Sequence, residues 1–268
     1  MKKIQFALLC AATLAMIACK PTGNEPDGPV VDDPNTDDPN TEEPGEYVSP
    51  ISVSDNSLAD WEGLENVASF TLPEGASYDG LKSVKVYADE MYINIAIEVN
   101  PETVTDLEWT PFHAYINCDN SAETGGYGDQ FTDPDADVCL ETAIYASGVA
   151  NSWNPGVFKW WGPVGGNGWA WTEHWEEEGY YTDGDGLNWG AIVGEGALPI
   201  GASQAIGNIH EIQLMWEMIP APNGWNEEGF TIGFDIQQNW SSVGILPIAA
   251  DDENGVVYAN KLAVKFNK

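Results

Sequence analysis

Tryptophans gather in one stretch of the chain, residues 153–175, where glycines and prolines separate them. The flat C–H faces of a sugar pack well on aromatic rings, and nearby amides and carboxylates bind its hydroxyl groups. On a strand, Trp169 and Trp171 would face the same side, and Trp175 shares their parity. We therefore predict a ligand-binding platform. Its members are Trp160, Trp169, Trp171 and Trp175, with Glu173 and Asn167 as polar partners.

The alternative for these rings is structural, because tryptophan is often largely buried in a core or over its end. Trp160 and Trp161 are adjacent, so on a strand they must point to opposite faces. Trp225 and Trp240 stand at turn or strand-end positions and are secondary candidates.

Oxygen-bearing side chains crowd a second stretch and suggest a cation site. Calcium binds six to eight hard oxygens from carboxylates, amides and backbone carbonyls. The candidate ligands are Asp119, Asn120, Asp129, Asp133, Asp135 and Asp137. The stretch does not match the EF-hand loop, which needs a glutamate at its twelfth position. Calcium is the cofactor we consider, and a solvated acidic loop is the alternative.

Two cysteines flank the same stretch. Cys118 ends one apolar run and Cys139 lies near the start of another. In an oxidising compartment they could form a disulfide that closes the loop between them, which stabilises by about 3 kcal/mol in the chain-entropy model. The other reading is a pair of buried free thiols that act as small hydrophobic side chains.

The N-terminus predicts export and anchoring. Lys2 and Lys3 precede an apolar run over residues 4–17, which is too short to span a bilayer comfortably. Cys19 follows Ala18 in a pattern that resembles a bacterial lipobox, which implies lipidation of Cys19. We predict a signal peptide over residues 1–18 and a membrane anchor at Cys19.

Residues 19–50 predict a disordered acidic linker, because they repeat Asp-Asp-Pro-Asn-Thr and contain almost no large apolar side chains. They resemble the acidic stretch after the lipid cysteine in surface lipoproteins of starch-utilising gut bacteria. The resemblance implies attachment to the outer membrane, a domain that faces the cell exterior, and an uptake complex as a partner.

Charge narrows the choice of ligand. The chain has 43 acidic residues against 9 basic ones and a net charge of −34, which loss of Lys2 and Lys3 makes more negative. Such a field repels nucleic acid and other polyanions. Neutral polysaccharide or oligosaccharide is the favoured partner.

Residues 51–268 predict an all-β domain. Apolar and β-branched runs alternate with turns rich in Gly, Asp, Asn and Pro, and no amphipathic helix of ordinary length is present. Many short strands with close turns indicate an antiparallel β-sandwich. The expected strands are Lys82–Ala88, Met91–Asn100, Phe112–Cys118, Val138–Ala146, Val157–Trp161, Trp169–Trp175, His210–Ile219, Phe230–Gln238, Gly244–Ala250 and Val256–Phe266.

Short motifs in this domain resemble the family 9 carbohydrate-binding modules and the related DOMON domains. The residues that carry the resemblance are Ser57–Leu64, Val84–Ile95, Ala114–Asn120, Thr124–Gly126 and Asp137–Glu141. The resemblance implies a jelly-roll-like sandwich and, by analogy of fold alone, glycan binding. The tryptophan-rich stretch lies outside the shared pattern.

Signatures of enzymes are weak. His113, His174 and His210 lack zinc-site spacing, and no nucleophile motif is present. We therefore expect a non-catalytic glycan-binding surface protein. The alternatives are an adhesive or structural protein that binds a protein partner, and a glycoside hydrolase that uses carboxylates such as Glu173 and Glu176–Glu178.

Overall fold

The computed structural model divides the chain into two units, residues 1–45 and residues 46–268. It describes residues 47–76, 78–107, 110–127, 130–143, 156–160, 162–166, 187–188, 200–219, 221–252 and 255–268. The predicted signal peptide, the anchor at Cys19 and nearly all of the predicted linker lie outside the described residues. Every described strand belongs to the second unit.

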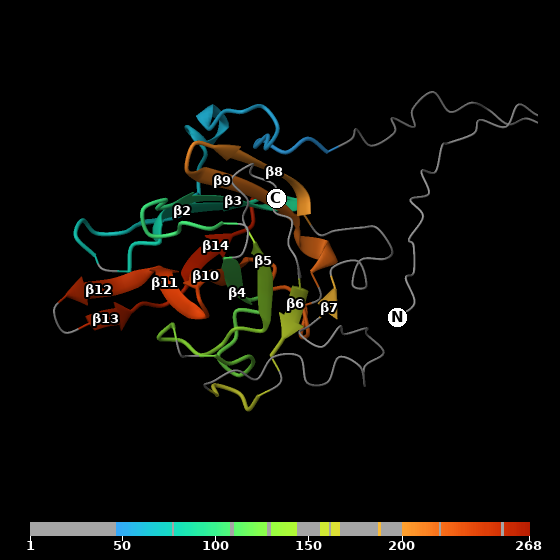
Figure 1. The fold of residues 1–268 in the computed structure, drawn as a ribbon. Coiled ribbons are helices and arrows are strands. Elements are labelled where there is room, and N and C mark those ends of the chain that lie inside the picture. Colours follow the sequence, from blue (N-terminus) through green and yellow to red (C-terminus); the bar gives the residue numbers. More distant parts are fainter. Residues whose placement is uncertain are drawn as a thin grey trace, which may run out of the picture. The chain divides into compact units, whose positions relative to one another are not determined.

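One sheet of the second unit has five antiparallel strands (Figure 1). Their order across the sheet is β1 (Ala68–Thr71), β2 (Leu81–Ala88), β3 (Tyr92–Val99), β9 (Ile209–Met215) and β8 (Ile200–Ile206). The β2–β3 hairpin closes at Asp89, whose carboxylate accepts hydrogen bonds from the backbone N–H groups of Met91 and Tyr92. Both strands of this hairpin are among those that the sequence predicts.

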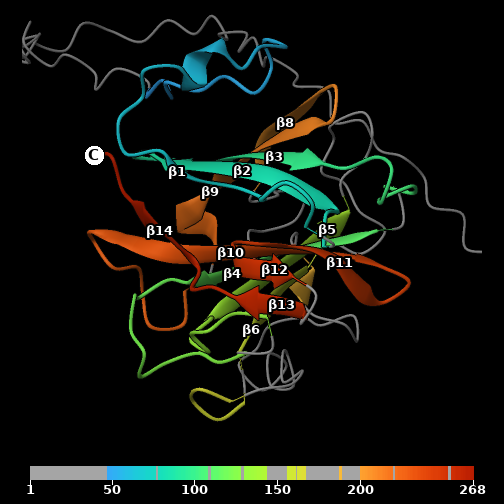
Figure 2. The same cartoon turned by 90° about the vertical axis from the view of Figure 1, so that its left-hand side faces the viewer.

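The second sheet has seven strands, which lie below the first sheet in both ribbon views (Figures 1 and 2). Its path is β11 (Ser241–Leu246), β10 (Gly229–Gln238), β4 (Pro111–Asn117), β5 (Val138–Ala143), β6 (Gly156–Lys159) and β7 (Leu187–Asn188). β14 (Leu262–Lys265) pairs with the first half of β10. β12 (Ile248–Asp252) and β13 (Gly255–Tyr258) form a separate ribbon.

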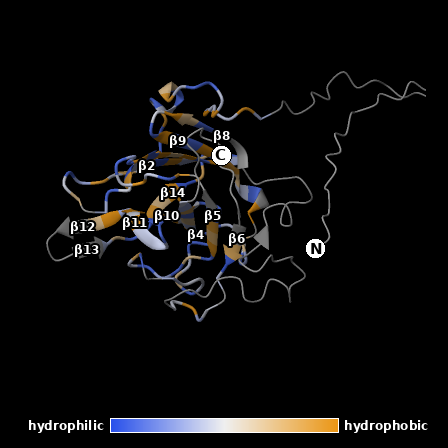
Figure 3. Cartoon of the chain, viewed as in Figure 1, coloured by the Kyte–Doolittle hydropathy of each residue, from blue (hydrophilic) through white to orange (hydrophobic). Residues whose placement is uncertain are grey.

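The main core lies between the two sheets, because alternate side chains of each strand point inward. The first sheet contributes buried side chains to this core, such as Val84 and Val86 of β2 and Ile95 of β3. From the second sheet, Phe112 and Phe234 stack with 5.9 Å between ring centroids. Figure 3 shows the strands carrying much of the apolar sequence.

Both sheets are also covered on their outer faces. Residues 47–64, which include the 3-10 turn Ala59–Trp61, lie over the first sheet, where Trp61 packs with Tyr87. The loop between β4 and β5 covers the second sheet, where Tyr127 stacks on Tyr115 at 4.9 Å between centroids. A sandwich with two covered outer faces buries polar groups that an open sheet would leave in water.

The predicted fold class, an all-β antiparallel sandwich, is confirmed. Three expected strands are shorter or divided. The run His210–Ile219 passes into the 3-10 turn Trp216–Met218, Gly244–Ala250 is divided between β11 and β12, and Val256–Phe266 is divided between β13 and β14. The expected strand Trp169–Trp175 lies outside the described residues. In the part of the chain that the structure describes, no helix is long and apolar enough to cross a membrane.

The expected disulfide is not formed, because the two cysteines occupy opposite faces of their strand pair. Tyr115 pairs with Cys139 and Ile116 pairs with Val138. Alternation therefore gives Cys118 the face of Ile116 and Cys139 the other face, whereas a disulfide needs Cβ atoms that point toward each other. Cys118 and Cys139 are free and buried, which is the alternative that the sequence left open.

This arrangement predicts how the thiols react. In the soluble protein that begins at Lys20, unfolded in guanidinium without reductant, Cys118 and Cys139 should both react with a thiol reagent. In the native protein neither should react quickly, because burial raises the pKa of both thiols well above the ordinary value. Absence of reaction in the denaturant would instead show that a disulfide had formed.

Candidate functional site

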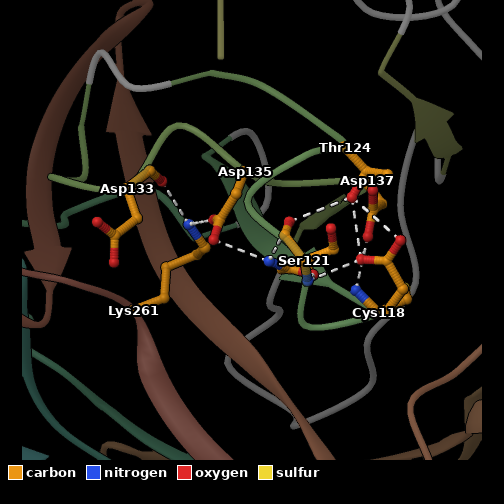
Figure 4. Close-up of polar contacts among 9 residues, drawn as sticks. Cys118, Ser121, Thr124, Asp133, Asp135, Asp137 and Lys261 are labelled. Carbon is orange, nitrogen blue, oxygen red and sulfur yellow. Dashed lines mark hydrogen bonds and ion pairs between the residues drawn. The ribbon is translucent and has the colours of Figure 1, made fainter. Parts of the chain in front are cut away.

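The loop between β4 and β5 binds its acidic residues to its own backbone (Figure 4). Asp137 accepts a hydrogen bond of 2.8 Å from the backbone N–H of Cys118. Asp119 accepts bonds from the Ser121 N–H at 2.9 Å and the Thr124 hydroxyl at 3.0 Å. The Asp119 contacts are typical of turns in which a carboxylate fixes the following backbone, whereas Asp137 joins the two ends of the loop.

Lys261 fastens the same loop to the segment before β14. Its ammonium group donates a 2.7 Å hydrogen bond to the carbonyl oxygen of Asp133 and forms an ion pair with the Asp135 carboxylate. The Lys261 side chain is only 1% exposed and lies 5.5 Å from the centre of the Phe131 ring. A buried ammonium needs such partners, because its transfer from water is costly. Figure 4 shows Lys261 between the two aspartates.

The predicted calcium ligands are therefore engaged in different local contacts. Asp119 and Asp137 lie near each other, whereas Asp133 and Asp135 meet Lys261. Asp129 lies outside the described residues. Among the residues that are described, no three His, Cys, Asp or Glu side chains are grouped so that they could hold a metal ion.

Burial and the neighbouring Asp119 carboxylate raise the pKa of Asp137 to about 6. Asp137 therefore takes up a proton more readily than an exposed aspartate does.

Removal of the Lys261 ammonium should destabilise the fold. Lys261→Ala leaves the partly buried Asp135 carboxylate without its cation, and loss of one member of a buried pair costs about 3–5 kcal/mol. We expect the free energy of unfolding in urea to fall by about that amount. The control is Lys265→Ala on β14, an exposed position where a change within about 0.5 kcal/mol is expected. Equal losses in both variants would contradict this role for Lys261.

A buried row of charged residues crosses the second sheet on the face that the loop covers. Asp235 on β10 pairs with His113 on β4, which in turn pairs with Glu141 on β5. The His113 Nε2 atom lies 2.6 Å from a Glu141 oxygen, and Nδ1 lies 3.5 Å from an Asp235 oxygen. Individual sequence motifs gave no sign of this row, since its members come from three separate strands.

The row continues toward the β10–β11 hairpin. Gln130 in the covering loop donates hydrogen bonds to Asp235 at 3.0 Å and to the Ser242 hydroxyl at 2.8 Å. Gln237 adds a 2.7 Å bond to Asp235. These amide donors both bind the Oδ2 atom of Asp235 and offset part of the cost of burying the carboxylate, whereas Oδ1 is buried without a hydrogen-bond partner among the described residues.

Two carboxylates keep His113 protonated. Burial alone would lower the pKa of His113, but the contacts with Asp235 and Glu141 outweigh it and raise the pKa to about 9. The row can therefore hold a proton at neutral pH, where an ordinary imidazole is mostly uncharged. Because the row is buried, we interpret it as a structural element of the sheet.

Stability should consequently depend on pH through His113. The folded-state pKa of about 9 exceeds the ordinary value of 6.5, so the contribution is fully present below pH 6.5 and is lost as pH rises through 9. The free energy of unfolding, measured with urea at pH 6.5, 8 and 10, should fall by a few kcal/mol as the pH rises.

The matched variants are His113→Gln, which should remove this pH-dependent loss, and His210→Gln, which should retain it. Burial lowers the pKa of His210 to about 4, so that residue does not titrate in this range. If the free energy of unfolding of the wild type and of His113→Gln changes equally between pH 8 and pH 10, the assignment of this pH dependence to His113 is contradicted.

Of the predicted platform, Trp160 is the member that the structure describes. It is 7% exposed, and its indole N–H donates a 3.1 Å hydrogen bond to the carbonyl oxygen of Pro163. Its ring packs so closely on Gly126 that a Cβ atom there would lie 2.0 Å from the indole. The placement of Trp160 in the core leaves little of its ring for a ligand. The other members, which lie outside the described residues, are Asn167, Trp169, Trp171, Glu173 and Trp175.

Trp160 begins a segment that we call the root and define as residues 160 and 162–166. The Gly165 N–H donates to the carbonyl of Gly125 at 3.0 Å, and the Tyr127 N–H donates to the carbonyl of Gly166 at 2.7 Å. The covering loop thus holds the chain just before Asn167. Beyond the tryptophans, Leu187–Asn188 returns as β7 and pairs with β6.

A tryptophan that is exposed, unlike Trp160, lies at the β10–β11 turn. Trp61 is buried like Trp160, and Trp216 and Trp225 are half-buried, but Trp240 is 80% exposed. The signal in the sequence is its setting: residues 236–250 contain no charged side chain, in a chain with 43 acidic residues.

Comparisons with protein-family models, with curated proteins and with solved structures give no match for this chain.

Proposed function

We propose that this protein is a non-catalytic, lipid-anchored surface module that binds neutral glycan. The observation that carries the proposal is a long loop, residues 160–186, which connects two paired strands and which we call the excursion. Gly156 pairs with Asn188 and Val157 pairs with Leu187, so β6 and β7 form a hairpin. Hairpin loops usually have about 2–5 residues, and much longer ones are commonly functional. This excursion contains Trp169, Trp171 and Trp175.

The root supports this reading, because binding loops work best when a rigid scaffold positions them. Its hydrogen bonds to the covering loop and the burial of Trp160 fix the chain up to Gly166. A ligand platform just beyond a fixed point loses less conformational entropy on binding. The polar partners that we propose there are Glu173 and Asn167.

The charge of the molecule favours a neutral ligand. With a net charge of −34, the protein repels uronate and sulfate chains as well as nucleic acid. The buried lysine, Lys261, is already paired with Asp135. Neutral sugar chains avoid this repulsion.

The proposed location is the outer membrane, with lipid on Cys19 and an acidic linker that lets the domain face the exterior. One partner we propose is an outer-membrane uptake complex that receives the bound glycan. Likeness to family 9 carbohydrate-binding modules agrees with this role by analogy. Calcium at Asp119 and Asp137 remains part of the proposal, and its removal is therefore one arm of the test.

Affinity electrophoresis provides the test, since a strongly acidic protein migrates readily in a native gel. The soluble protein that begins at Lys20 is run through gels that contain neutral glucan, neutral mannan or polygalacturonate, with calcium or with a chelator. We expect saturable retardation by at least one neutral polysaccharide and none by polygalacturonate.

The double variant Trp169→Ala/Trp171→Ala should weaken binding about tenfold or more, which corresponds to about 1.4 kcal/mol. The matched control is Val164→Ala, an exposed position in the root, which should bind like the wild type. Unaltered migration in every neutral gel would contradict the proposal. Release of reducing ends would favour the glycoside hydrolase, and binding to matrix protein alone would favour the adhesive role.

A further inference from the structure

The tip of the β10–β11 hairpin places a tryptophan where the backbone favours glycine. Gln238 pairs with Ser241, so Asn239 and Trp240 form a two-residue loop. Their φ angles are +52° and +64°, as in a type I′ turn. Asn-Gly is the preferred sequence for such a turn, because a side chain at positive φ meets the backbone. Here Trp240 stands where glycine is usual.

Folding gains little from this residue. The ring of Trp240 is 80% exposed, so it contributes little buried area, and its backbone conformation is unfavourable for a bulky side chain. Strained residues that packing does not explain are concentrated at functional sites. The geometry therefore points to a use for the exposed ring.

The side chains around Trp240 suit sugar hydroxyls. Next to Trp240 in the sequence, Asn239 and Ser241 offer an amide and a hydroxyl group, and no charged residue occurs from 236 to 250. The nearby side chains of Gln237, Gln238 and Ser242 already form hydrogen bonds within the protein. An amide or hydroxyl group can both donate and accept hydrogen bonds. An exposed ring with uncharged polar neighbours matches a neutral sugar, whose C–H face stacks while its hydroxyl groups bond.

The base of the hairpin is held firmly. Gln130 donates a 2.8 Å hydrogen bond to the Ser242 hydroxyl, and Gln238 donates a 3.1 Å bond to the Thr105 hydroxyl. Gln130 also joins this base to buried Asp235. A ring on a fixed turn needs little ordering when it meets a ligand.

We propose that Trp240 forms a second sugar-stacking subsite for neutral glycan, separate from the excursion of residues 160–186. The strand register shows that the hairpin tip and the root lie at different ends of the second sheet. Ile236, near the end of β10, pairs with Phe112 at the start of β4. Glu141, near the end of β5, pairs with Gly156 at the start of β6. The hairpin tip thus belongs to the end of the sheet where β6 begins, and the root follows the end where β6 finishes. A subsite at the hairpin tip, at the other end of the sheet from the root, would let the domain contact a polymer, or two chains, at more than one point. The ligand class rests on the proposed function.

Other occupants fit less well. An anionic lipid surface or a nucleic acid would be repelled by the net charge of −34, and the tip carries no lysine that would attract it. A stable protein interface needs about 800 Å² from each partner, and a two-residue turn with one ring supplies only a small part of that area.

The decisive variant is Trp240→Gly, which removes the ring and installs the residue that the turn prefers. We expect the melting temperature to stay the same or rise, because glycine relieves the positive-φ conformation. Retardation by the neutral polysaccharide should weaken severalfold or more in affinity electrophoresis of the soluble protein that begins at Lys20. Trp240→Tyr, which retains an aromatic face, should restore most of the binding.

The variants also separate the two proposals. If Trp240→Gly binds as the wild type does while Trp169→Ala/Trp171→Ala loses binding, the subsite at Trp240 is refuted and the proposed function stands. If no neutral polysaccharide retards the wild type, both are refuted. Binding that depends on Trp240 but occurs only with phosphatidylcholine vesicles or a purified matrix protein would also refute the subsite. Additive losses in the combined variant would support two independent subsites.

Discussion

A scarcity of positive charge constrains this molecule more than any other property. The chain has 43 acidic residues and 9 basic ones, yet its covered sheets bury several carboxylates. Each buried carboxylate needs a cation or strong hydrogen-bond donors, because an isolated ion in the interior is unstable. His113 meets that need in the second sheet, and the buried Lys261 pairs with the partly buried Asp135 of the covering loop.

These two cations link the fold to both proposed binding regions. Lys261 holds the covering loop, and the same loop forms backbone hydrogen bonds with the root through Gly125 and Tyr127. The row that contains His113 reaches Ser242 through Asp235 and Gln130, next to the β10–β11 tip. Buried polar contacts therefore hold both the root and the base of the hairpin that carries Trp240. Among the described residues, no group of metal ligands takes part.

Sequence patterns predicted the strands whose burial alternates or whose residues are strongly apolar, such as β3 and β10. They missed β1, β8 and the two-residue β7. β1 has only four residues, and β8 contains glycine, alanine and serine, which give a weak strand signal. The prediction of a disulfide was wrong for a different reason. The face on which each cysteine lies depends on the β4–β5 register, which one sequence does not reveal. The charged row depends on register in the same way. Trp240 was identifiable from its uncharged surroundings, but its exposure and positive φ required the structure.

The central claim is that exposed tryptophans of this sandwich bind neutral glycan. All 12 tryptophans can be followed at once through their indole N–H signals in a ¹H–¹⁵N NMR titration of the soluble protein with neutral gluco- and manno-oligosaccharides. The account predicts saturable shifts for Trp240 and for Trp169, Trp171 or Trp175, while buried Trp61 stays unchanged. An absence of shifts with every neutral oligosaccharide, or shifts confined to buried indoles, would contradict it.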